Sequence, residues 1–252
     1  MKNQITFLGT SHGDPTLTRF CSSTLYQLGE THFLIDAGEP VTGLLVRQEV
    51  KPCLLDAVFM THMHVDHIGG LPALVHYIMK YPDPQRKTEL LFPEREGMIH
   101  FRNWMDAMKA YIRPEQVFYT ALEPDSCWQC KGVKVSCIPT EHVKHINAPS
   151  YAYMIETEDC RILHTGDLAA DFHDFPKLNP EKPVDICICE ATHIHNRLDQ
   201  FIEDIKGQPI RKLVFNHIGP LWTDGKEKIL EDAAAVLPFP VVIARDGTKI
   251  DF

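Results

Sequence analysis

Three histidines and an aspartate lie within six consecutive positions of this 252-residue chain. The segment reads Thr61-His62-Met63-His64-Val65-Asp66-His67-Ile68-Gly69-Gly70. Neutral imidazole and carboxylate are ligands that suit zinc, manganese and iron. A surface loop has no reason to alternate His-x-His and then add Asp-His, so His62, His64, Asp66 and His67 are predicted to bind metal.

The residues on either side of this cluster are predicted to hold it in place. Residues 54–60 form a short, apolar, partly β-branched run, which is typical of a buried strand. Residues 68–81 begin with two glycines and then carry apolar residues at helical spacing. The cluster is therefore expected in the connection between a strand and a helix, with its backbone fixed at both ends.

Three further candidate ligands each follow a predicted strand in the second half of the chain. They are His142, Asp167 and His217, after strands predicted at residues 132–139, 161–164 and 212–215. Strand ends are where loops build functional sites. His145 is an alternative to His142, which we prefer because it lies nearer to its strand.

The remaining pattern predicts strands separated by a few helices. Strands are expected at residues 4–8, 23–28, 31–36, 151–156, 184–189 and 241–244, and helices at 98–112 and 226–236. Residues 82–95, rich in proline and charge, are expected to cross the surface. The apolar stripe of 98–112 is interpreted as core. No linker interrupts the chain, so a single domain over 1–252 is predicted, although composition does not establish how its sheets pair.

Composition and charge limit the class of protein. Hydrophobic residues make up 44% and charged residues 23% of the chain, as in ordinary globular proteins. The net charge of −9 argues against a surface that coats nucleic acid. There is no secretion signal or membrane-spanning run, which favours a cytoplasmic protein and no membrane partner.

The eight cysteines are scattered, which suits a reducing compartment. Cys127 and Cys130 form a lone CxxC pair with no second pair nearby. Reduced surface thiols are the favoured interpretation of this pair, and a metal or redox role is the alternative.

With these positions in place, the chain resembles the metallo-β-lactamase superfamily. The resemblance rests on His62-x-His64-x-Asp66-His67 followed by His142, Asp167 and His217, and it covers nearly the whole chain. It implies an α+β fold, a four-layer αββα sandwich with a dinuclear metal site at one edge. Carried over by position, it implies that His62, His64 and His142 hold one metal, that Asp66, His67 and His217 hold the second, and that Asp167 bridges them.

Single positions separate the branches of this superfamily. Oxygen-reducing diiron members carry glutamate where this chain has His64. Zinc β-lactamases usually carry cysteine or serine near the position of Asp167 and are exported. Glyoxalase II-type thioesterases have a Thr-Pro-Gly-His signature where this chain has Glu141-His142-Val143-Lys144-His145. None of these branches fits.

The chain looks most like the ribonuclease Z and phosphodiesterase branch. The similar segments are Phe7-Leu8-Gly9-Thr10-Ser11, Ile35-Asp36-Ala37-Gly38-Glu39, Gly69-Gly70-Leu71-Pro72 and Glu190-Ala191-Thr192. In that branch a histidine after the Glu-Ala-Thr element serves the substrate phosphate. His195 is the best-placed candidate for that role here, with His193 as the alternative, and the branch's usual His-Ser-Thr surround is missing.

One departure from ribonuclease Z concerns its substrate. Those enzymes carry a long tRNA-gripping arm, typically between the third ligand histidine and the bridging aspartate. Here 24 residues separate His142 from Asp167, and two strands with a turn fill them. With the negative charge, this makes tRNA an unlikely substrate and favours a smaller phosphodiester or nucleotide.

The resemblance therefore predicts a metal-dependent hydrolase with two divalent ions, preferably zinc, with manganese or iron as alternatives. A metal-activated hydroxide is expected to attack phosphorus, with Asp66 as proton acceptor. His195 is expected to assist the phosphoryl oxygen or the leaving group, and Glu190 to orient it. A lactone or carboxylic ester hydrolase and a non-catalytic, metal-loaded nucleotide-binding protein remain alternatives. The sequence is compatible with a homodimer but does not fix the oligomeric state.

Overall fold

The structure is a computed structural model that describes residues 3–192, 194, 197–223 and 226–252. It divides into two compact units, one made of Met1–Glu123 with Asp246–Phe252 and the other of Pro124–Arg245. Each unit contains one seven-stranded mixed sheet with helices. That the whole chain forms a single domain stays a prediction.

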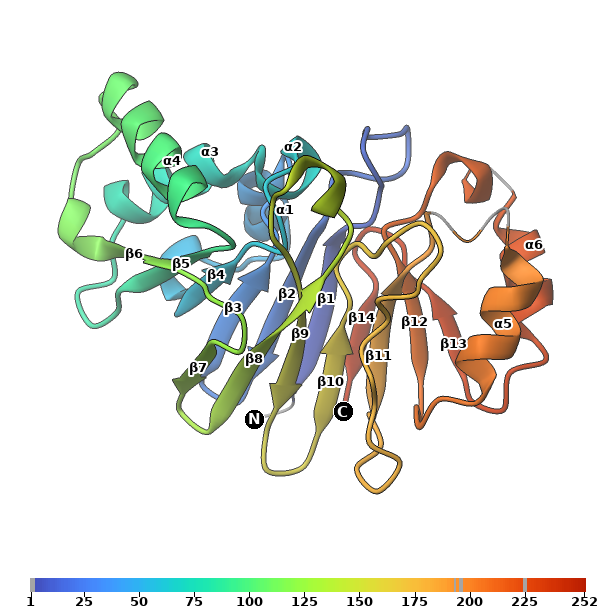
Figure 1. The fold of residues 1–252 in the computed structure, drawn as a ribbon. Coiled ribbons are helices and arrows are strands. Elements are labelled where there is room, and N and C mark those ends of the chain that lie inside the picture. The colour runs from blue at the N-terminus through green and yellow to red at the C-terminus, as the bar shows by residue number, and fades with distance from the viewer. Residues whose placement is uncertain (1–2, 193, 195–196, 224–225) are drawn as a thin grey trace. The chain divides into compact units, whose positions relative to one another are not determined.

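The sheet of the first unit is built from the N-terminal strands and the last strand of the chain. Its strands are β1 (Gln4–Gly9), β2 (Ser23–Leu28), β3 (Thr31–Ile35), β4 (Ala57–Phe59), β5 (Thr88–Phe92), β6 (Val117–Ala121) and β14 (Lys249–Asp251). Their order is β14-β1-β2-β3-β4-β5-β6 (Figure 1). Pairings from β14 to β3 are antiparallel, and those from β3 to β6 are parallel.

Four helices accompany this sheet. They are α1 (Val41–Arg47), α2 (Val65–Ile68), α3 (Leu71–Lys80) and α4 (Arg95–Ala107), with 3-10 turns at Pro52–Leu54 and Pro114–Gln116. Helix α3 buries Leu71, Leu74, Val75 and Ile78, the i, i+3, i+4, i+7 stripe of a helix packed on one side. Its proline lies in the first turn, where the missing N–H costs no hydrogen bond.

The second unit has its own sheet. Its strands are β7 (Cys127–Cys130), β8 (Val133–Thr140), β9 (Ser150–Glu156), β10 (Arg161–His164), β11 (Ile186–Glu190), β12 (Leu213–Asn216) and β13 (Val241–Ile243). Their order is β13-β12-β11-β10-β9-β8-β7. Pairings from β7 to β10 are antiparallel and those from β10 to β13 are parallel.

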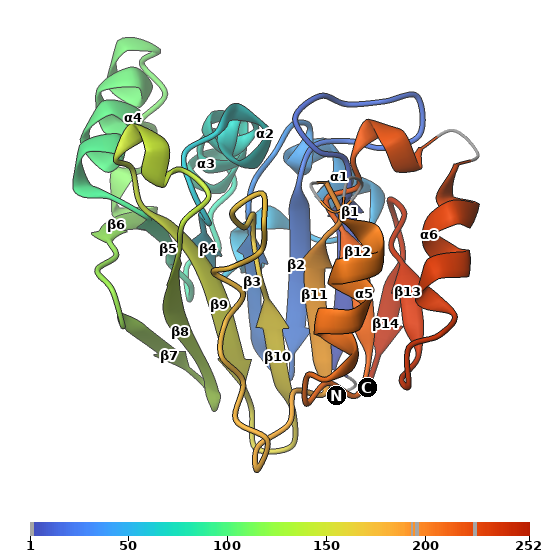
Figure 2. The ribbon, with the colours of Figure 1, turned by 45° about the vertical axis from the view of Figure 1, so that its right-hand side comes forward.

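Helices α5 (Leu198–Lys206) and α6 (Glu227–Ala234) belong to this unit, with 3-10 turns at Lys144–Ile146 and Pro220–Trp222. Figure 2 shows α5 lying across the strands β11 and β12. Helix α5 buries Phe201, Ile202 and Ile205. These side chains join Cys187 and Phe215 of the strands in one apolar cluster, so the second unit has its own core.

Most predicted strands are confirmed to within two residues. Two of these strands, β2 and β3, form a hairpin in which Leu28 pairs with Thr31 across a two-residue turn. The strand predicted at 54–60 is shorter, since only Ala57–Phe59 pairs and a 3-10 turn precedes it. The single helix predicted at 68–81 is wrong in detail, because α2 ends at Ile68 and α3 begins at Leu71.

Two expectations in the first unit are wrong in a larger sense. Residues 82–95 do not simply cross the surface, because Thr88–Phe92 forms β5, a strand with partners on both sides. The stripe expected in the core at 98–112 is buried only in part. Phe101 and Met105 are buried in α4, whereas Trp104 is 52% exposed. The spacing of apolar residues along a helix does not by itself show which of them are buried in the folded protein.

The helices of the described residues include none that is long and apolar enough to cross a membrane.

Candidate metal centre

The first unit brings the opening cluster together directly after β4. His62 Nε2 lies 2.9 Å from His64 Nδ1, and His67 Nε2 lies 3.3 Å from Asp66 Oδ2. The rings of His62 and His67 have centroids 4.1 Å apart. Asp66 and His67 are buried in the first turns of α2, so the strand-to-helix connection places three rings and one carboxylate close to one another.

A buried carboxylate and a hydroxyl support these rings. Asp36 follows β3, and its Oδ2 lies 2.7 Å from His67 Nδ1. Asp36 Oδ1 also accepts hydrogen bonds from the backbone N–H of Thr61 at 2.8 Å and from the Thr61 hydroxyl at 3.0 Å. The same hydroxyl lies 3.0 Å from His62 Nδ1. Thr61 therefore links the two rings to one carboxylate.

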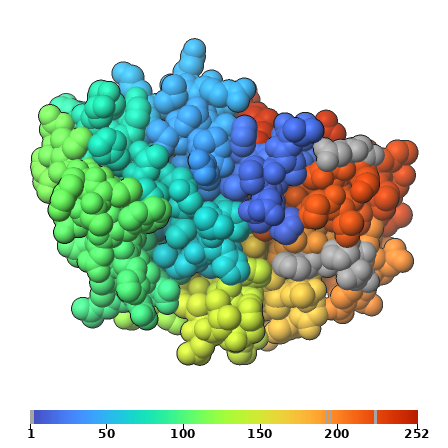
Figure 3. All heavy atoms as spheres, turned by 90° about the horizontal axis from the view of Figure 1, so that it is seen from above, coloured from blue at the N-terminus to red at the C-terminus, as the bar shows by residue number. Residues whose placement is uncertain are grey.

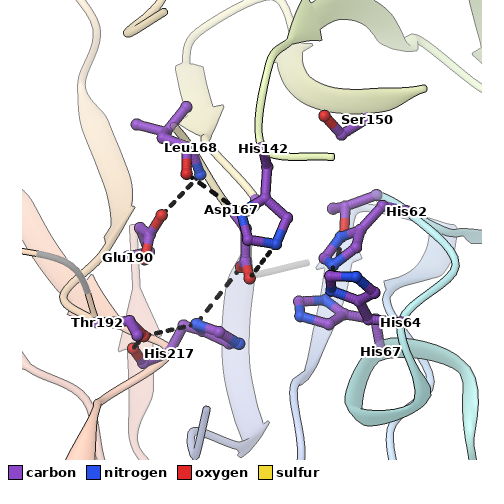
Figure 4. A network of polar contacts seen from close by, with 12 residues as sticks. His62, His64, His67, His142, Ser150, Asp167, Leu168, Glu190, Thr192 and His217 are labelled. Atoms are coloured by element: carbon purple, nitrogen blue, oxygen red, sulfur yellow. Dashed lines mark hydrogen bonds and ion pairs between the residues drawn. The ribbon is translucent and has the colours of Figure 1, made fainter. Parts of the chain in front are cut away.

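The second unit gathers its three candidate ligands around one carboxylate. Asp167 Oδ2 lies 3.6 Å from His142 Nε2, and Asp167 Oδ1 lies 3.4 Å from His217 Nδ1 (Figure 4). The three residues follow β8, β10 and β12. Asp167 is thus the centre of this group, as a bridging ligand would be.

Backbone and hydroxyl groups orient the two histidines of the second unit. His142 Nδ1 lies 3.2 Å from the carbonyl oxygen of Leu168. Thr192 Oγ1 donates to the carbonyl oxygen of His217 at 2.7 Å, and it lies 2.9 Å from His217 Nδ1. His217 has a φ of 51°, a conformation that a non-glycine residue adopts only when its surroundings hold it. The two contacts with Thr192 help to keep His217 in this conformation.

These contacts favour the tautomer in which Nδ1 of each ring carries the proton. A carbonyl and a carboxylate only accept, so His142 and His67 donate from Nδ1. The Thr192 hydroxyl donates its proton to the His217 carbonyl, so the hydroxyl oxygen accepts a hydrogen bond from the Nδ1–H of His217. Thr61 donates to Asp36 and accepts from His62 Nδ1 in the same way. Each Nε2 then carries a lone pair, the form that binds a metal.

The contact between His62 and His64 fits a cation as well. Two ring nitrogens at 2.9 Å need a shared proton or a shared positive ion. Zinc–nitrogen bonds of about 2.0–2.1 Å place neighbouring ligand atoms only slightly farther apart than this. The nitrogen and carboxylate donors of both units therefore suit a borderline divalent ion.

The remaining predicted site residues have different surroundings. His145 lies in an exposed 3-10 turn, whereas His142 is the histidine beside Asp167. Glu190 is buried, and its Oε1 accepts the backbone N–H of Leu168 at 2.6 Å, so it holds the residue next to Asp167. His193 and His195 lie outside the described residues.

Sequence reasoning quoted Asp36 and Thr192 within motifs without giving them a role, and it missed Gly13 altogether. The backbone N–H of Gly13 donates to Asp66 Oδ2 at 2.8 Å. Gly13 has a φ of 57°, which glycine adopts without strain. A glycine in a polar loop between strands was the only available signal. Burial and the charge of Asp66 raise the pKa of the Cys21 thiol close by, so this cysteine stays neutral.

Solved structures of similar shape define the fold. The metallo-β-lactamase fold protein YhfI of Bacillus subtilis aligns with a TM-score of 0.78 and 19% identity, covering 100% of this chain and 99% of that one. Human short-form tRNase Z aligns at 0.69 with 20% identity and 98% coverage of both chains. A diphosphatase of the PhnP family aligns at 0.71 with 19% identity, covering 100% and 98%. The chain has the metallo-β-lactamase fold, and the predicted fold class is confirmed.

Sequence matches narrow this class. Ribonuclease Z of Methanocaldococcus jannaschii is 30% identical over 156 residues, which are 61% of this chain and 47% of that protein. A ribonuclease Z of Prochlorococcus marinus is 44% identical over 160 residues, 62% and 50% of the two chains. The matched part spans about half the length of these relatives. Residues 3–228 match the family described as anti-Pycsar protein Apyc1, and the chain belongs to that family. The predicted superfamily, in its ribonuclease Z branch, is confirmed.

Proposed function

We propose that the chain is a dinuclear metal-dependent hydrolase that cleaves a small phosphodiester or nucleotide. The observation that carries this proposal is that the Nδ1 atoms of four imidazole rings each lie within hydrogen-bond distance of a protein group. His62, His67, His142 and His217 each have Nδ1 held by a protein group, which leaves Nε2 as the ligand atom. A purely structural set of buried histidines has no need for this shared arrangement.

The assignment of ligands follows the superfamily pattern. His62, His64 and His142 would hold one divalent ion, Asp66, His67 and His217 would hold the second, and Asp167 would be shared between them. Zinc fits the nitrogen and carboxylate donors, and manganese or iron are alternatives. Asp167 supports the bridging role because each of its carboxylate oxygens lies beside a different histidine.

Two divalent ions, when bound, lower the pKa of water and offset negative charge on phosphoryl oxygens. Asp66 is the proposed proton acceptor. Its Oδ2 is held by the Gly13 N–H beside His67, so its orientation is fixed before substrate arrives. Preorganised groups of this kind need no rearrangement during the reaction.

His195 is proposed to assist the phosphoryl oxygen or to protonate the leaving group, with Glu190 as the carboxylate that orients it. If that role holds, His195→Ala lowers kcat for phosphodiesters by roughly 100-fold or more. Turnover within about threefold of wild type removes His195 from the mechanism. Parallel measurement of His193→Ala decides between the two histidines.

A small substrate is proposed because the connection from His142 to Asp167 contains two strands and not the tRNA-gripping arm of ribonuclease Z. Strands β9 and β10 pair antiparallel within it, from Glu156 with Arg161 to Tyr153 with His164. The net charge of −9 adds repulsion against a polyanion. Together they favour a small phosphodiester over tRNA.

Metal analysis with a turnover panel tests the proposal. About two metal equivalents per chain are expected, with turnover of phosphodiesters or cyclic nucleotides above that of lactones and thioesters. A protein that cannot be loaded with metal contradicts the proposal, and faster turnover of lactones replaces it with an ester hydrolase. If nucleotides bind at saturating metal but are not turned over, the chain is a non-catalytic nucleotide-binding protein.

The chain offers a matched control three residues away from a proposed ligand. His142→Asn removes a nitrogen beside Asp167 and is expected to lose metal and activity. His145→Asn changes an exposed histidine of the next turn and is expected to retain both. Equal effects of the two substitutions contradict the ligand assignment.

A further inference from the structure

Residues 10–20, within the connection between β1 and β2, form a loop that carries Gly13, the residue whose N–H binds Asp66. In Figure 3 its atoms, coloured dark blue, lie on the surface of the face shown. The loop is closed at its base, where the backbone N–H of Ser11 donates to the Phe20 carbonyl at 2.7 Å. Loops of this kind, tied at both ends, often carry function.

One carboxylate from the far end of the sequence binds both ends of this loop. Asp246 Oδ1 accepts the backbone N–H of Thr10 at 2.9 Å and the Thr10 hydroxyl at 2.7 Å. Asp246 Oδ2 accepts the backbone N–H of Phe20 at 2.7 Å. Asp246 lies between β13 and β14, more than 220 positions from the loop. Without it, the two loop ends lose their shared acceptor.

Buried polar contacts extend from this carboxylate into the loop. Arg19 is 2% exposed, and its Nη1 donates to the Thr10 hydroxyl at 2.6 Å. The backbone N–H of Thr16 donates to the Arg19 carbonyl at 2.8 Å. Burial raises the pKa of Asp246, while its hydrogen bonds with Thr10 and Phe20 and the Arg19 charge act in the other direction. These partners offset part of the cost of burying the Asp246 carboxylate.

The loop makes its contact with the candidate site at Gly13. The N–H of Gly13 donates to Asp66 Oδ2 at 2.8 Å, and the same oxygen lies 3.3 Å from His67 Nε2. Nothing lies within 4 Å of a side chain built at Gly13. The glycine is thus needed for its backbone conformation, which aims the N–H, and not for space.

We infer that Asp246 is a positioning residue for Asp66. Asp246 fixes the ends of the loop, the loop fixes the N–H of Gly13, and that N–H fixes the orientation of the Asp66 carboxylate. This inference rests on the proposed function for its consequence, because Asp66 is a proposed metal ligand. The linkage itself is a property of the metal-free protein.

The test measures the linkage with and without metal in the full-length chain. Asp246→Asn leaves an amide nitrogen where one backbone N–H needs an acceptor, so the loop ends separate. In metal-free protein, exchange of the Gly13 amide hydrogen is expected to be at least about tenfold faster in Asp246→Asn, and also in Asp66→Ala, than in wild type. With metal, the affinity measured against a chelator is expected to fall by about 10–100-fold in Asp246→Asn.

Asp251→Asn is the matched control. Asp251 is an exposed carboxylate of the same C-terminal segment, and it accepts a hydrogen bond from Gln4 Nε2 at 2.7 Å. It is expected to leave both readouts within about twofold of wild type, since single exposed polar contacts contribute little. Thr10→Val, which removes one of the bonds to Asp246, gives a milder second variant if Asp246→Asn does not fold.

The outcomes separate this inference from the proposed function. Unchanged Gly13 exchange in Asp246→Asn and Thr10→Val overturns the linkage, whatever the metal data. Faster exchange with unchanged metal affinity overturns the positioning role. If wild type binds no metal, the proposed function fails, while faster exchange in both Asp246→Asn and Asp66→Ala still supports the linkage.

Discussion

At the scale of single residues, the candidate site is defined by the partners of Nδ1. His67 has a carboxylate partner, His142 a backbone carbonyl, and His62 and His217 each a threonine hydroxyl. A carboxylate makes the opposite ring nitrogen more basic than a carbonyl or a hydroxyl does. His67 is therefore expected to be the strongest of the four nitrogen donors, and its support by Asp36 the most consequential.

Asp36→Asn tests that expectation. The amide cannot serve both the backbone N–H of Thr61 and the Nδ1–H of His67 as the carboxylate does. Metal affinity, measured by competition with a chelator, is expected to fall by about 10–100-fold. Asp56→Asn is the control, because Asp56 is also a carboxylate that accepts hydrogen bonds next to a strand; it is half-buried and paired with Arg86 and the His32 N–H.

An equal loss of metal affinity in Asp36→Asn and Asp56→Asn indicates general destabilisation and contradicts the specific role of Asp36. The sequence predicts the candidate ligands from their spacing around one strand, and their assignment to metal stays a prediction. It gives no role to Asp36, since 31 positions separate this residue from His67 and only the pairing of β3 with β4 brings them together.

At the scale of elements, alternation and apolar runs predict the strands that border the site. Strand β5 was not predicted because proline and charge on both sides of it mask its short apolar run, Leu90-Leu91-Phe92. Helix α1, only seven residues long, was not predicted either. Both are held by tertiary contacts, which outweigh local propensity in short segments.

A pair of glycine substitutions tests how tightly these elements pack. A side chain at Gly38 meets the Asp66 carbonyl oxygen at 2.2 Å and Cys21 Cβ at 2.7 Å, whereas one at Gly43 in α1 meets nothing within 4 Å. Gly38→Ala is expected to lower the free energy of unfolding by about 1–3 kcal/mol and to displace the start of α2. Gly43→Ala is expected to raise it by about 0.5–1 kcal/mol. Urea unfolding measures both.

A pH-dependent link joins two segments near the second group of ligands. His173 contacts Asp171 through Nδ1, and its Nε2 lies 3.0 Å from Glu141 Oε2. The Asp171 and Glu141 carboxylates raise the pKa of His173. His173 in turn lowers the pKa of Asp171, and Lys144, then His173, lower that of Glu141.

The directions of these pKa shifts determine how the stabilisation of the folded state depends on pH. The raised pKa of His173 gives stability that is present below its unfolded pKa of about 6.5 and is lost as pH rises through the folded value. The two carboxylates give stability above about pH 4 that is lost at lower pH. The difference in Tm between wild type and His173→Asn is therefore expected to peak at mildly acidic pH and to narrow by pH 9. A constant difference, or one that widens with pH, contradicts the link. High salt should reduce it, because the groups are exposed.

At the scale of the whole molecule, both sheets show the same order of pairings, three antiparallel and then three parallel. The sequence shows the repeated strand-rich pattern but no repeated motif. Three of the segments that carry candidate ligands follow strands with a parallel neighbour, β4, β10 and β12. Strand ends of parallel sheets are common positions for sites, so the architecture agrees with the predicted position of the candidate site.

The reactivity of the cysteine thiols tests which parts of the chain are buried. Cys127 and Cys130 lie three positions apart on β7, so their side chains point to opposite faces and cannot chelate one ion together. Cys127 is exposed, Cys53 and Cys130 are half-buried, and five thiols are buried. Burial raises the pKa of Cys137 and of Cys160 to about 12, and it raises the pKa of Cys187 and Cys189 as well.

Because the thiolate is the reactive form, a thiol reagent should modify native protein in an order set by exposure. One fast phase from Cys127 is expected, then slower reaction of Cys53 and Cys130, and the five buried thiols should react only in denaturant. Cys127→Ser should remove the fast phase and leave the rest, and Cys187→Ser should change only the total in denaturant. Rapid reaction of more than three thiols in native protein contradicts the burial of the core strands β10 to β12, which Cys187 and Cys189 report.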